Sequence, residues 1–70
     1  MHDQQKITDW RGRIIGFIDL MPDGTKIVRD EYRRILGKYD KRYDVTRDFY
    51  GRIIAQGDQS GMLLNLPRNS

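Results

Sequence analysis

The chain has 70 residues, which is enough for one small domain and too few to bury a large core. It contains no cysteine, so no disulfide or cysteine-bound zinc can add stability, and its one histidine, His2, lies in a polar N-terminal stretch. The formal net charge is +3, with nine Arg against four Lys and nine Asp against one Glu. With no cysteine nucleophile and no base close to either serine, we expect no enzyme, no catalytic residue, no metal site and no cofactor.

The composition favours β-structure over helix. Only one Ala is present, while Ile, Val, Thr, Tyr and Phe are common and seven Gly are spread along the chain. No apolar run approaches the roughly 20 residues that a membrane-spanning helix needs, and the N-terminus lacks the layout of a signal peptide. We therefore expect a cytoplasmic protein with no membrane partner.

Turn signals divide the chain into short strands. Asp9-Trp10-Arg11-Gly12 places Asp at the start of a turn and Gly at its end, and Met21-Pro22-Asp23-Gly24 adds Pro at the first central position. Residues 1–4 and 67–70 are predicted to be flexible ends, and residues 5–66 to form one domain. We expect an all-β antiparallel meander of about seven strands, over residues 6–8, 13–19, 25–29, 34–39, 45–47, 52–56 and 62–66.

A motif that occurs three times organises the sequence. It reads Asp-x-x-(Gly/Arg)-Arg-Ile-(Ile/Leu)-(Gly/Ala)-x-x-Asp and begins at Asp9, Asp30 and Asp48. Self-similarity at a period of roughly 20 residues is typical of a pseudo-symmetric repeat, here of three hairpins. Because the core of so short a chain is marginal, we expect homo-oligomerisation to complete the fold.

Alternation along the predicted strands indicates which residues share a face. The small residues Gly16, Gly37 and Ala55 occupy the same position in the three copies, which indicates close approach of another backbone or of a ligand. The same alternation places Ile35 on the face of Gly37 and Leu36 on the opposite face.

A helical alternative remains open for residues 29–43, where several apolar residues also fall at helical spacing. It would give a β-hairpin with one central helix. The equivalent stretch of the first copy contains Gly12 and Gly16 among β-branched residues, which favours strands. The apolar segment 62–66 is expected to seal the core or a subunit interface.

Three arginines follow the repeated aspartates by four residues. They can pair with those aspartates and serve only to stabilise the fold, because Arg suits paired hydrogen bonds to a carboxylate. Alternatively they form a cationic ring or stripe that binds an anion, with aromatic rings at the turn tips stacking on a base. The candidate ligand-binding residues are therefore Arg13, Arg34, Arg52, Trp10, Tyr32 and Tyr50.

Gly-Arg-Ile-Ile-Gly-Phe-Ile-Asp (12–19) and Asp-Gly-Thr-Lys-Ile-Val-Arg-Asp (23–30), followed by Ile-Leu-Gly (35–37), resemble the hairpin repeats of the short bacterial β-flower proteins. The resemblance covers most of residues 7–58. It implies petals of antiparallel hairpins around an axis and no particular activity. The chain departs from the pattern at Arg33, where a turn Gly is expected, and its three clear units suggest that other subunits complete any ring.

These features lead to two hypotheses of function. The first is an oligomeric, non-enzymatic binding module for an anionic ligand, namely a nucleotide, a nucleotide-derived signal or nucleic acid, which the protein sequesters. The second is a structural or protein–protein interaction module, in which the repeated Arg and Asp residues only stabilise the fold and its interface.

Overall fold

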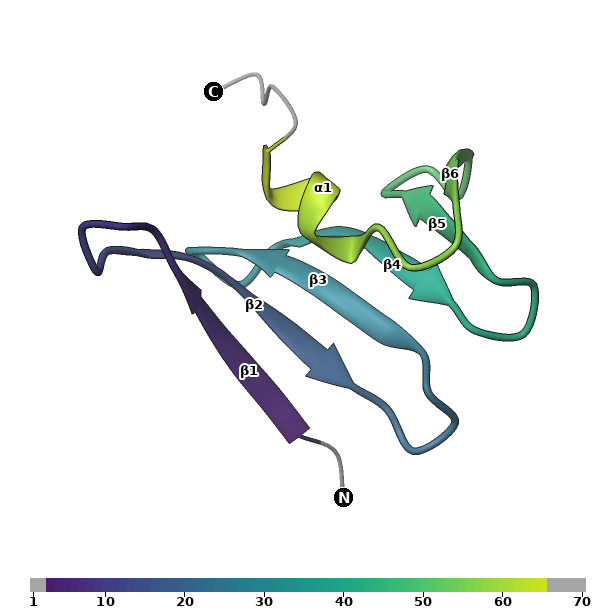
Figure 1. Ribbon diagram of the computed structural model, residues 1–70, viewed down its shortest axis with the longest axis horizontal. Helices are drawn as coiled ribbons and strands as arrows, with labels where there is room; N and C mark the ends of the chain where they lie inside the picture. The colour runs from purple at the N-terminus through teal and green to yellow at the C-terminus, as the bar shows by residue number, and fades with distance from the viewer. Residues whose placement is uncertain (1–2, 66–70) are drawn as a thin grey trace.

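A computed structural model describes residues 3–65 as one antiparallel sheet with one short helix (Figure 1). The six strands follow one another in the order β1-β2-β3-β4-β5-β6, so each strand pairs with its neighbours in the chain. This arrangement confirms the predicted all-β meander of hairpins. The elements are β1 (Asp3–Thr8), β2 (Ile14–Leu20), β3 (Lys26–Asp30), β4 (Ile35–Asp40), β5 (Val45–Asp48), β6 (Ile53–Gln56) and α1 (Ser60–Asn65).

Residues 29–43 do not form the alternative central helix, because β4 is paired on both sides. Gly37 of β4 lies opposite Val28 of β3, and Lys38 of β4 lies opposite Arg47 of β5. Asp3 and Gln4, which were assigned to the flexible N-terminal end, belong to β1, and residues 1 and 2 lie outside the described residues. The predicted flexible end at 67–70 lies outside the described residues.

The prediction of a seventh strand over residues 62–66 is wrong. The part of this segment that the structure describes belongs to α1, and residue 66 lies outside the described residues. A strand would point Leu63 and Leu64 to opposite faces, whereas in the helix both side chains are buried against the sheet. Asp58 initiates the helix, because its Oδ1 accepts hydrogen bonds from the backbone N–H (3.2 Å) and the hydroxyl (2.8 Å) of Ser60.

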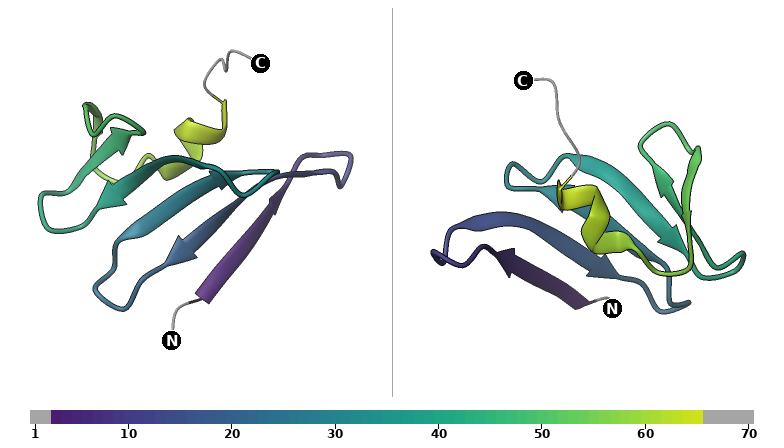
Figure 2. Two further views of the ribbon diagram at one scale, coloured as in Figure 1. Left: turned by 180° about the vertical axis from the view of Figure 1, so that it is seen from behind. Right: turned by 45° about the horizontal axis from the view of Figure 1, so that its top comes forward.

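The helix covers one face of the sheet, over β3 and β4 (Figures 1 and 2). Val28 of β3 is fully buried beneath it and contacts Leu63 and Leu64. The apolar segment thus seals the core, as the sequence predicted, although as a helix. Partly buried side chains from four strands surround this centre, namely Ile7, Ile18, Leu36 and Ile54.

A β-bulge recurs at the same position of all three hairpins. In the second hairpin Val28 lies opposite Gly37, and Arg29 lies opposite Ile35, so Leu36 is the extra residue. The bulge overturns the simple alternation predicted for this strand. Leu36 packs against the core on the same face as Gly37, and Ile35 stays exposed. The register shifts at Ile7/Thr8 and Thr46/Arg47 make Ile15 and Ile54 the equivalent extra residues.

Ion pairs join each hairpin to the next. Arg29 Nε lies 2.8 Å from Asp19 Oδ2, and Arg47 Nε lies 3.8 Å from Asp40 Oδ2. Asp19 and Asp40 are the final residues of the first two copies of the motif. Asp58, the final residue of the third copy, pairs instead with Lys26 Nζ at 2.6 Å, in addition to its bonds to the helix. The repeated aspartates therefore position the hairpins and the helix relative to one another.

Candidate functional site

The three repeated turns all lie at the same end of the sheet, because they join β1 to β2, β3 to β4 and β5 to β6 (Figure 2). We call this end the turn edge; it comprises residues 9–14, 30–35 and 48–53. Neighbouring turns are two strands apart, which corresponds to about 10 Å. The turn edge is therefore a row of equivalent units, and the six predicted site residues form a stripe that does not converge on one pocket.

An aspartate holds each turn through its backbone. In the second turn, Asp30 Oδ1 accepts hydrogen bonds from the N–H groups of Tyr32 (2.8 Å) and Arg34 (2.9 Å). Asp9 and Asp48 make the same pair of bonds two and four residues ahead, at 2.9 to 3.0 Å. The third loop position has a left-handed backbone in every turn, at Gly12 (φ 81°), Arg33 (φ 70°) and Gly51 (φ 85°).

Each repeated arginine pairs with the aspartate of its own turn. Arg34 Nε lies 2.9 Å from Asp30 Oδ2, and the corresponding distances in the first and third turns are 3.4 Å and 3.1 Å. These three arginine side chains nevertheless remain about three-quarters exposed, at 73%, 73% and 74%. The arginines thus contribute to the turns and still face solvent.

The turn carboxylates are charged at neutral pH. Burial raises the pKa of Asp30, but the backbone N–H and the guanidinium of Arg34 lower it more, so that the net shift is downward. The pKa of Asp48 is lowered by the same balance, and that of Asp9 is lowered first by the backbone N–H of Arg13. Each Arg–Asp pair therefore carries no net charge. The turn edge as a whole contains five Arg, three Asp and one Glu, so its formal net charge is +1.

The aromatic rings of the turn edge are highly exposed. Trp10 is 86% exposed, Tyr32 74% and Tyr50 78%. The guanidinium of Arg34 lies 5.4 Å from the centre of the Tyr32 ring, and Arg52 lies at the same distance from Tyr50. In the first turn Arg11 takes this place, 4.7 Å from the ring of Trp10. The three units thus present the same combination of ring and guanidinium.

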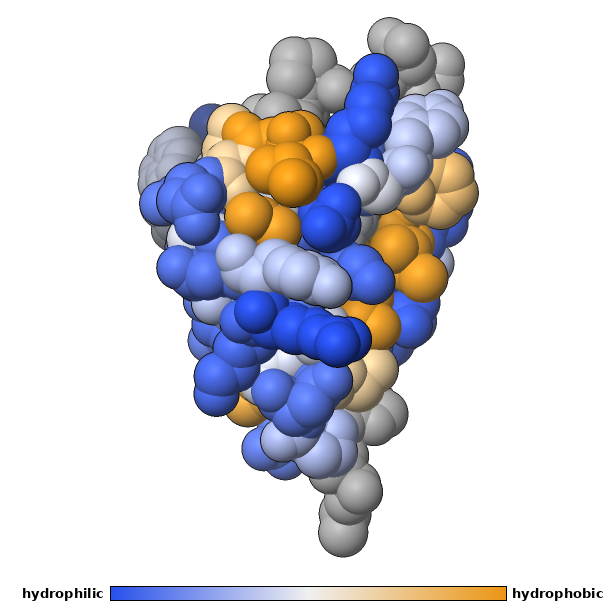
Figure 3. Space-filling model, turned by 90° about the vertical axis from the view of Figure 1, so that its right-hand side faces the viewer, coloured by the Kyte–Doolittle hydropathy of each residue, from blue (hydrophilic) through white to orange (hydrophobic). Residues whose placement is uncertain are grey.

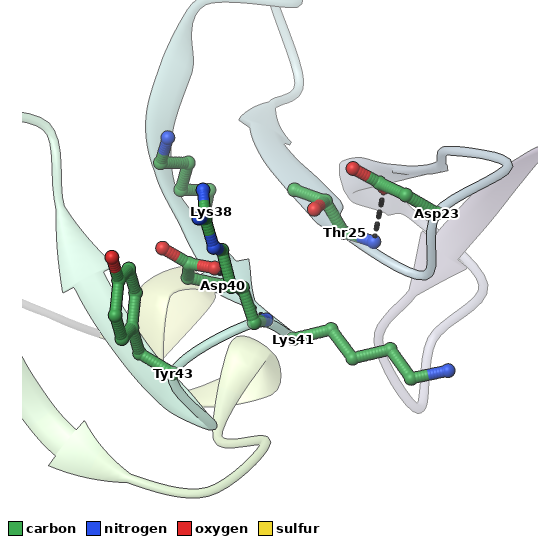
Figure 4. A pocket seen from close by; sticks show the side chains of 7 residues that line it. Asp23, Thr25, Lys38, Asp40, Lys41 and Tyr43 are labelled. Atoms are coloured by element: carbon green, nitrogen blue, oxygen red, sulfur yellow. Dashed lines mark hydrogen bonds between the residues drawn. The ribbon is translucent and has the colours of Figure 1, made fainter.

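A groove at the opposite end of the sheet was not predicted from the sequence. It has a volume of about 640 Å³ and lies between the β2–β3 turn and the β4–β5 turn (Figure 4). Lys41, Arg42 and Tyr43 follow one another in the sequence, but the residues across the groove come from a separate turn. The residues that line the groove are Asp23, Thr25, Lys38, Asp40, Lys41, Arg42 and Tyr43.

The surface around the β4–β5 turn is mixed in character. On the side that carries this turn and β6, hydrophilic side chains form a band with apolar side chains on either side of it (Figure 3). Tyr43 is exposed here, with Arg42 5.6 Å and Arg47 6.0 Å from its ring centre. Nearby, Asp44 accepts a hydrogen bond from the hydroxyl of Tyr39 (2.7 Å), which raises the pKa of Tyr39 to about 12.

Residues 3–65 contain neither a metal-binding cluster nor a helix that could span a membrane. No group of three or more His, Cys, Asp or Glu side chains in this part of the chain is arranged to hold a metal ion. The helix in the same range is too short to cross a membrane.

Comparison with known proteins reveals no relative of this chain. No family model matches the sequence, and neither a curated protein nor a solved structure matches it significantly.

Proposed function

We propose that the protein is a non-enzymatic module that binds single-stranded nucleic acid along the turn edge. The observation that carries this proposal is the threefold presentation of an exposed aromatic ring, by turns of the same geometry, in one row. Every nucleobase has a face that can stack on such a ring, and each stacked base contributes about 1–3 kcal/mol. The three rings are stacking platforms for successive segments of one strand.

The turn geometry prepares these platforms for binding. Asp30 and its two counterparts fix the loop backbone, so less conformational freedom is lost when a ligand orders the rings. Each repeated arginine pairs through Nε and stays largely exposed, so its guanidinium can also approach a phosphate oxygen. The formal net charge of +3 favours a polyanion over a neutral ligand.

A labelled oligothymidylate without a terminal phosphate tests the proposal by fluorescence anisotropy. We expect saturable binding that weakens with salt, and a loss of about 5- to 100-fold in affinity for each of Trp10→Ala, Tyr32→Ala and Tyr50→Ala. Tyr43→Ala is the matched control, because Tyr43 is an exposed ring at the opposite end of the sheet. Absence of saturable binding at low salt, or an equal loss in Tyr43→Ala, contradicts the proposal.

A protein-binding function is the second candidate, because apolar side chains accompany the aromatic rings. Ile14, Ile35 and Ile53, the first isoleucines of the three copies, are all exposed beside the turns. A contiguous exposed apolar surface is typical of an interaction site, and a second copy of the chain would suit a small core that needs further burial. Native mass spectrometry measures the number of subunits. A discrete oligomer that dissociates in the Ile35→Asp variant favours the second candidate if the protein also has no affinity for the oligothymidylate.

A further inference from the structure

We propose that the groove between the β2–β3 and β4–β5 turns binds a doubly charged phosphate group, either inorganic phosphate or the terminal phosphate of an ester. This site lies at the opposite end of the sheet from the turn edge, and the proposal is independent of nucleic-acid binding there. Its basis is a set of cations that, unlike the three repeated arginines of the turn edge, form no ion pair within 4.0 Å among the described residues.

Three cations line the groove, namely Lys38 from β4 and Lys41 and Arg42 from the turn that follows it. Within residues 3–65, none of the three has a carboxylate oxygen within 4.0 Å of its side-chain nitrogens. Most other cations of the sheet are neutralised: Lys26, Arg29, Arg47 and the three turn arginines all form ion pairs. With Asp23 and Asp40, these three cations leave the lining of the groove with a net charge of +1.

The two acids of the groove are already engaged. Asp23 Oδ1 accepts a hydrogen bond from the backbone N–H of Thr25 (2.9 Å), which lowers the pKa of Asp23. Asp40 Oδ1 accepts one from the backbone N–H of Arg42 (3.0 Å), and Asp40 Oδ2 lies 3.8 Å from Arg47 Nε. These bonds tie the carboxylates to the two turns, so the acids shape the groove while Arg47 offsets part of their charge.

Lys41 connects the two turns that form the walls. Its aliphatic chain packs against Gly24, and a Cβ at this position would require the Lys41 side chain to move. In Figure 4, Lys38 and Tyr43 stand on the β4–β5 side and Asp23 and Thr25 on the other side, and Lys41 extends beneath the β2–β3 turn with its ammonium pointing away from Lys38. A volume of about 640 Å³ lies within the range of small-molecule sites, so the groove also has room for the organic part of an ester.

The phosphate group fits this arrangement better than a carboxylate does. It brings two negative charges and three acceptor oxygens, which match several separate donors, and hydrogen bonds between ionised groups are the strongest of their class. A singly charged phosphodiester inside an oligonucleotide offers less charge to the same donors. Binding of a phosphate ester is therefore expected to weaken as the pH falls through about 6, where the second proton returns to the ester phosphate.

The test is a ¹H–¹⁵N NMR titration with inorganic phosphate and, separately, with AMP, at constant ionic strength. We expect saturable shifts confined to the amides of residues 23–25 and 38–43, and a loss of about tenfold or more in affinity for Lys38→Ala and Arg42→Ala. Lys6→Ala is the control, because it removes the same charge from an exposed position of β1, outside both the groove and the turn edge, and should leave the affinity unchanged. The spectrum of each variant also reports whether it is folded.

Either ligand can support the proposal, and the comparison identifies the source of the phosphate. Tighter binding of AMP than of inorganic phosphate means that the groove also holds the organic part, and equal binding means that it holds the phosphate alone. Shifts that spread over all charged surfaces without saturation overturn the proposal, as does an equal loss of affinity in Lys6→Ala. Because the oligothymidylate carries no terminal phosphate, these outcomes are separate from those of the test at the turn edge.

Discussion

A Cβ atom on Gly37 would lie only 2.8 Å and 2.9 Å from the two terminal methyl carbons of Leu63. A Cβ on Gly16 would likewise collide with Leu64. The small residues at these positions predicted that another group lies close to the strand. At Gly16 and Gly37 this group is a leucine of α1 together with the carbonyl oxygen of a neighbouring strand. These two glycines determine how near the helix can lie to the sheet.

Gly37→Ala is expected to destabilise the protein by about 1–3 kcal/mol, because the added methyl group would collide with the carbonyl oxygen of Arg47 and with the methyl groups of Leu63. Chemical denaturation followed by circular dichroism measures the change in the free energy of unfolding. Gly61→Ala is the control, since a Cβ on this helical residue would have no atom within 4 Å in the described structure. A neutral or stabilising effect of Gly37→Ala would show that α1 does not pack as closely as described.

Arg33 occupies the position of the second turn at which the other two copies have Gly, and its contacts explain the difference. It takes the left-handed backbone conformation with φ 70°, which costs a residue with a side chain more than it costs Gly. In return its guanidinium lies 4.2 Å from the ring centre of the buried Phe17 and donates a hydrogen bond to Gln4 Oε1 (2.9 Å). The unfavourable backbone of the second turn is thus offset by contacts to β1 and β2.

At the scale of the element, the repeated turn depends more on its aspartate than on its arginine. Asp30→Ala leaves the buried end of the turn without the acceptor for two backbone N–H groups, and we expect a loss of about 1–3 kcal/mol in the free energy of unfolding. Arg34→Ala removes an ion pair whose arginine is 73% exposed, so about 1 kcal/mol or less should be lost. Urea denaturation of both variants compares them, and a larger loss in Arg34→Ala would refute this ranking.

The turns and most strands could be predicted because their signals are local. Asp at the first position specifies the turn geometry regardless of what packs on it, and all three copies fold in that way, including the second, which has Arg33 where the other two have Gly. The bulges could not be predicted, because a bulge is defined by the pairing of two strands. Residues 62–66 were misassigned because a short apolar run suits a strand or a helix equally well until its packing is known.

The same distinction applies to the candidate sites. Trp10, Tyr32 and Tyr50 were predicted because they belong to the repeated turn and recur with it. The groove was missed because Lys38, Lys41 and Arg42 meet Asp23 and Thr25 only after β3 has placed two separate turns side by side. A motif search within one segment cannot reveal a site that two turns share.

For the molecule as a whole, acid is expected to loosen all three hairpins and the helix together. The pKa values of Asp9, Asp30, Asp48 and Asp58 all lie below the ordinary 3.8 in the folded protein. Their contribution to stability is complete above that value and is lost as the pH falls below it through the lowered pKa values. The melting temperature, followed by circular dichroism from about pH 7 to pH 2, should therefore fall mainly below pH 4.

Asp30→Asn supplies the comparison for this acid titration, because its amide oxygen can still accept the backbone hydrogen bonds but the side chain cannot titrate. The variant should be less stable than the parent at neutral pH, and the difference should shrink as the pH falls. A melting temperature that is constant from pH 5 to about pH 2 would contradict the assignment of these carboxylates as structural.

Asp58 has a consequence for the length of the hairpin array. Asp19 and Asp40 each form an ion pair with an arginine of the following hairpin. Asp58, the equivalent residue of the third copy, pairs instead with Lys26 of β3 and accepts a hydrogen bond from the start of α1. A fourth hairpin joined after Gly57 would compete for that carboxylate and would release the helix that supplies Leu63 to the core. Within residues 3–65, the side chain of Asp58 thus ends the series of ion pairs between successive hairpins and links the third hairpin to the helix that closes the core.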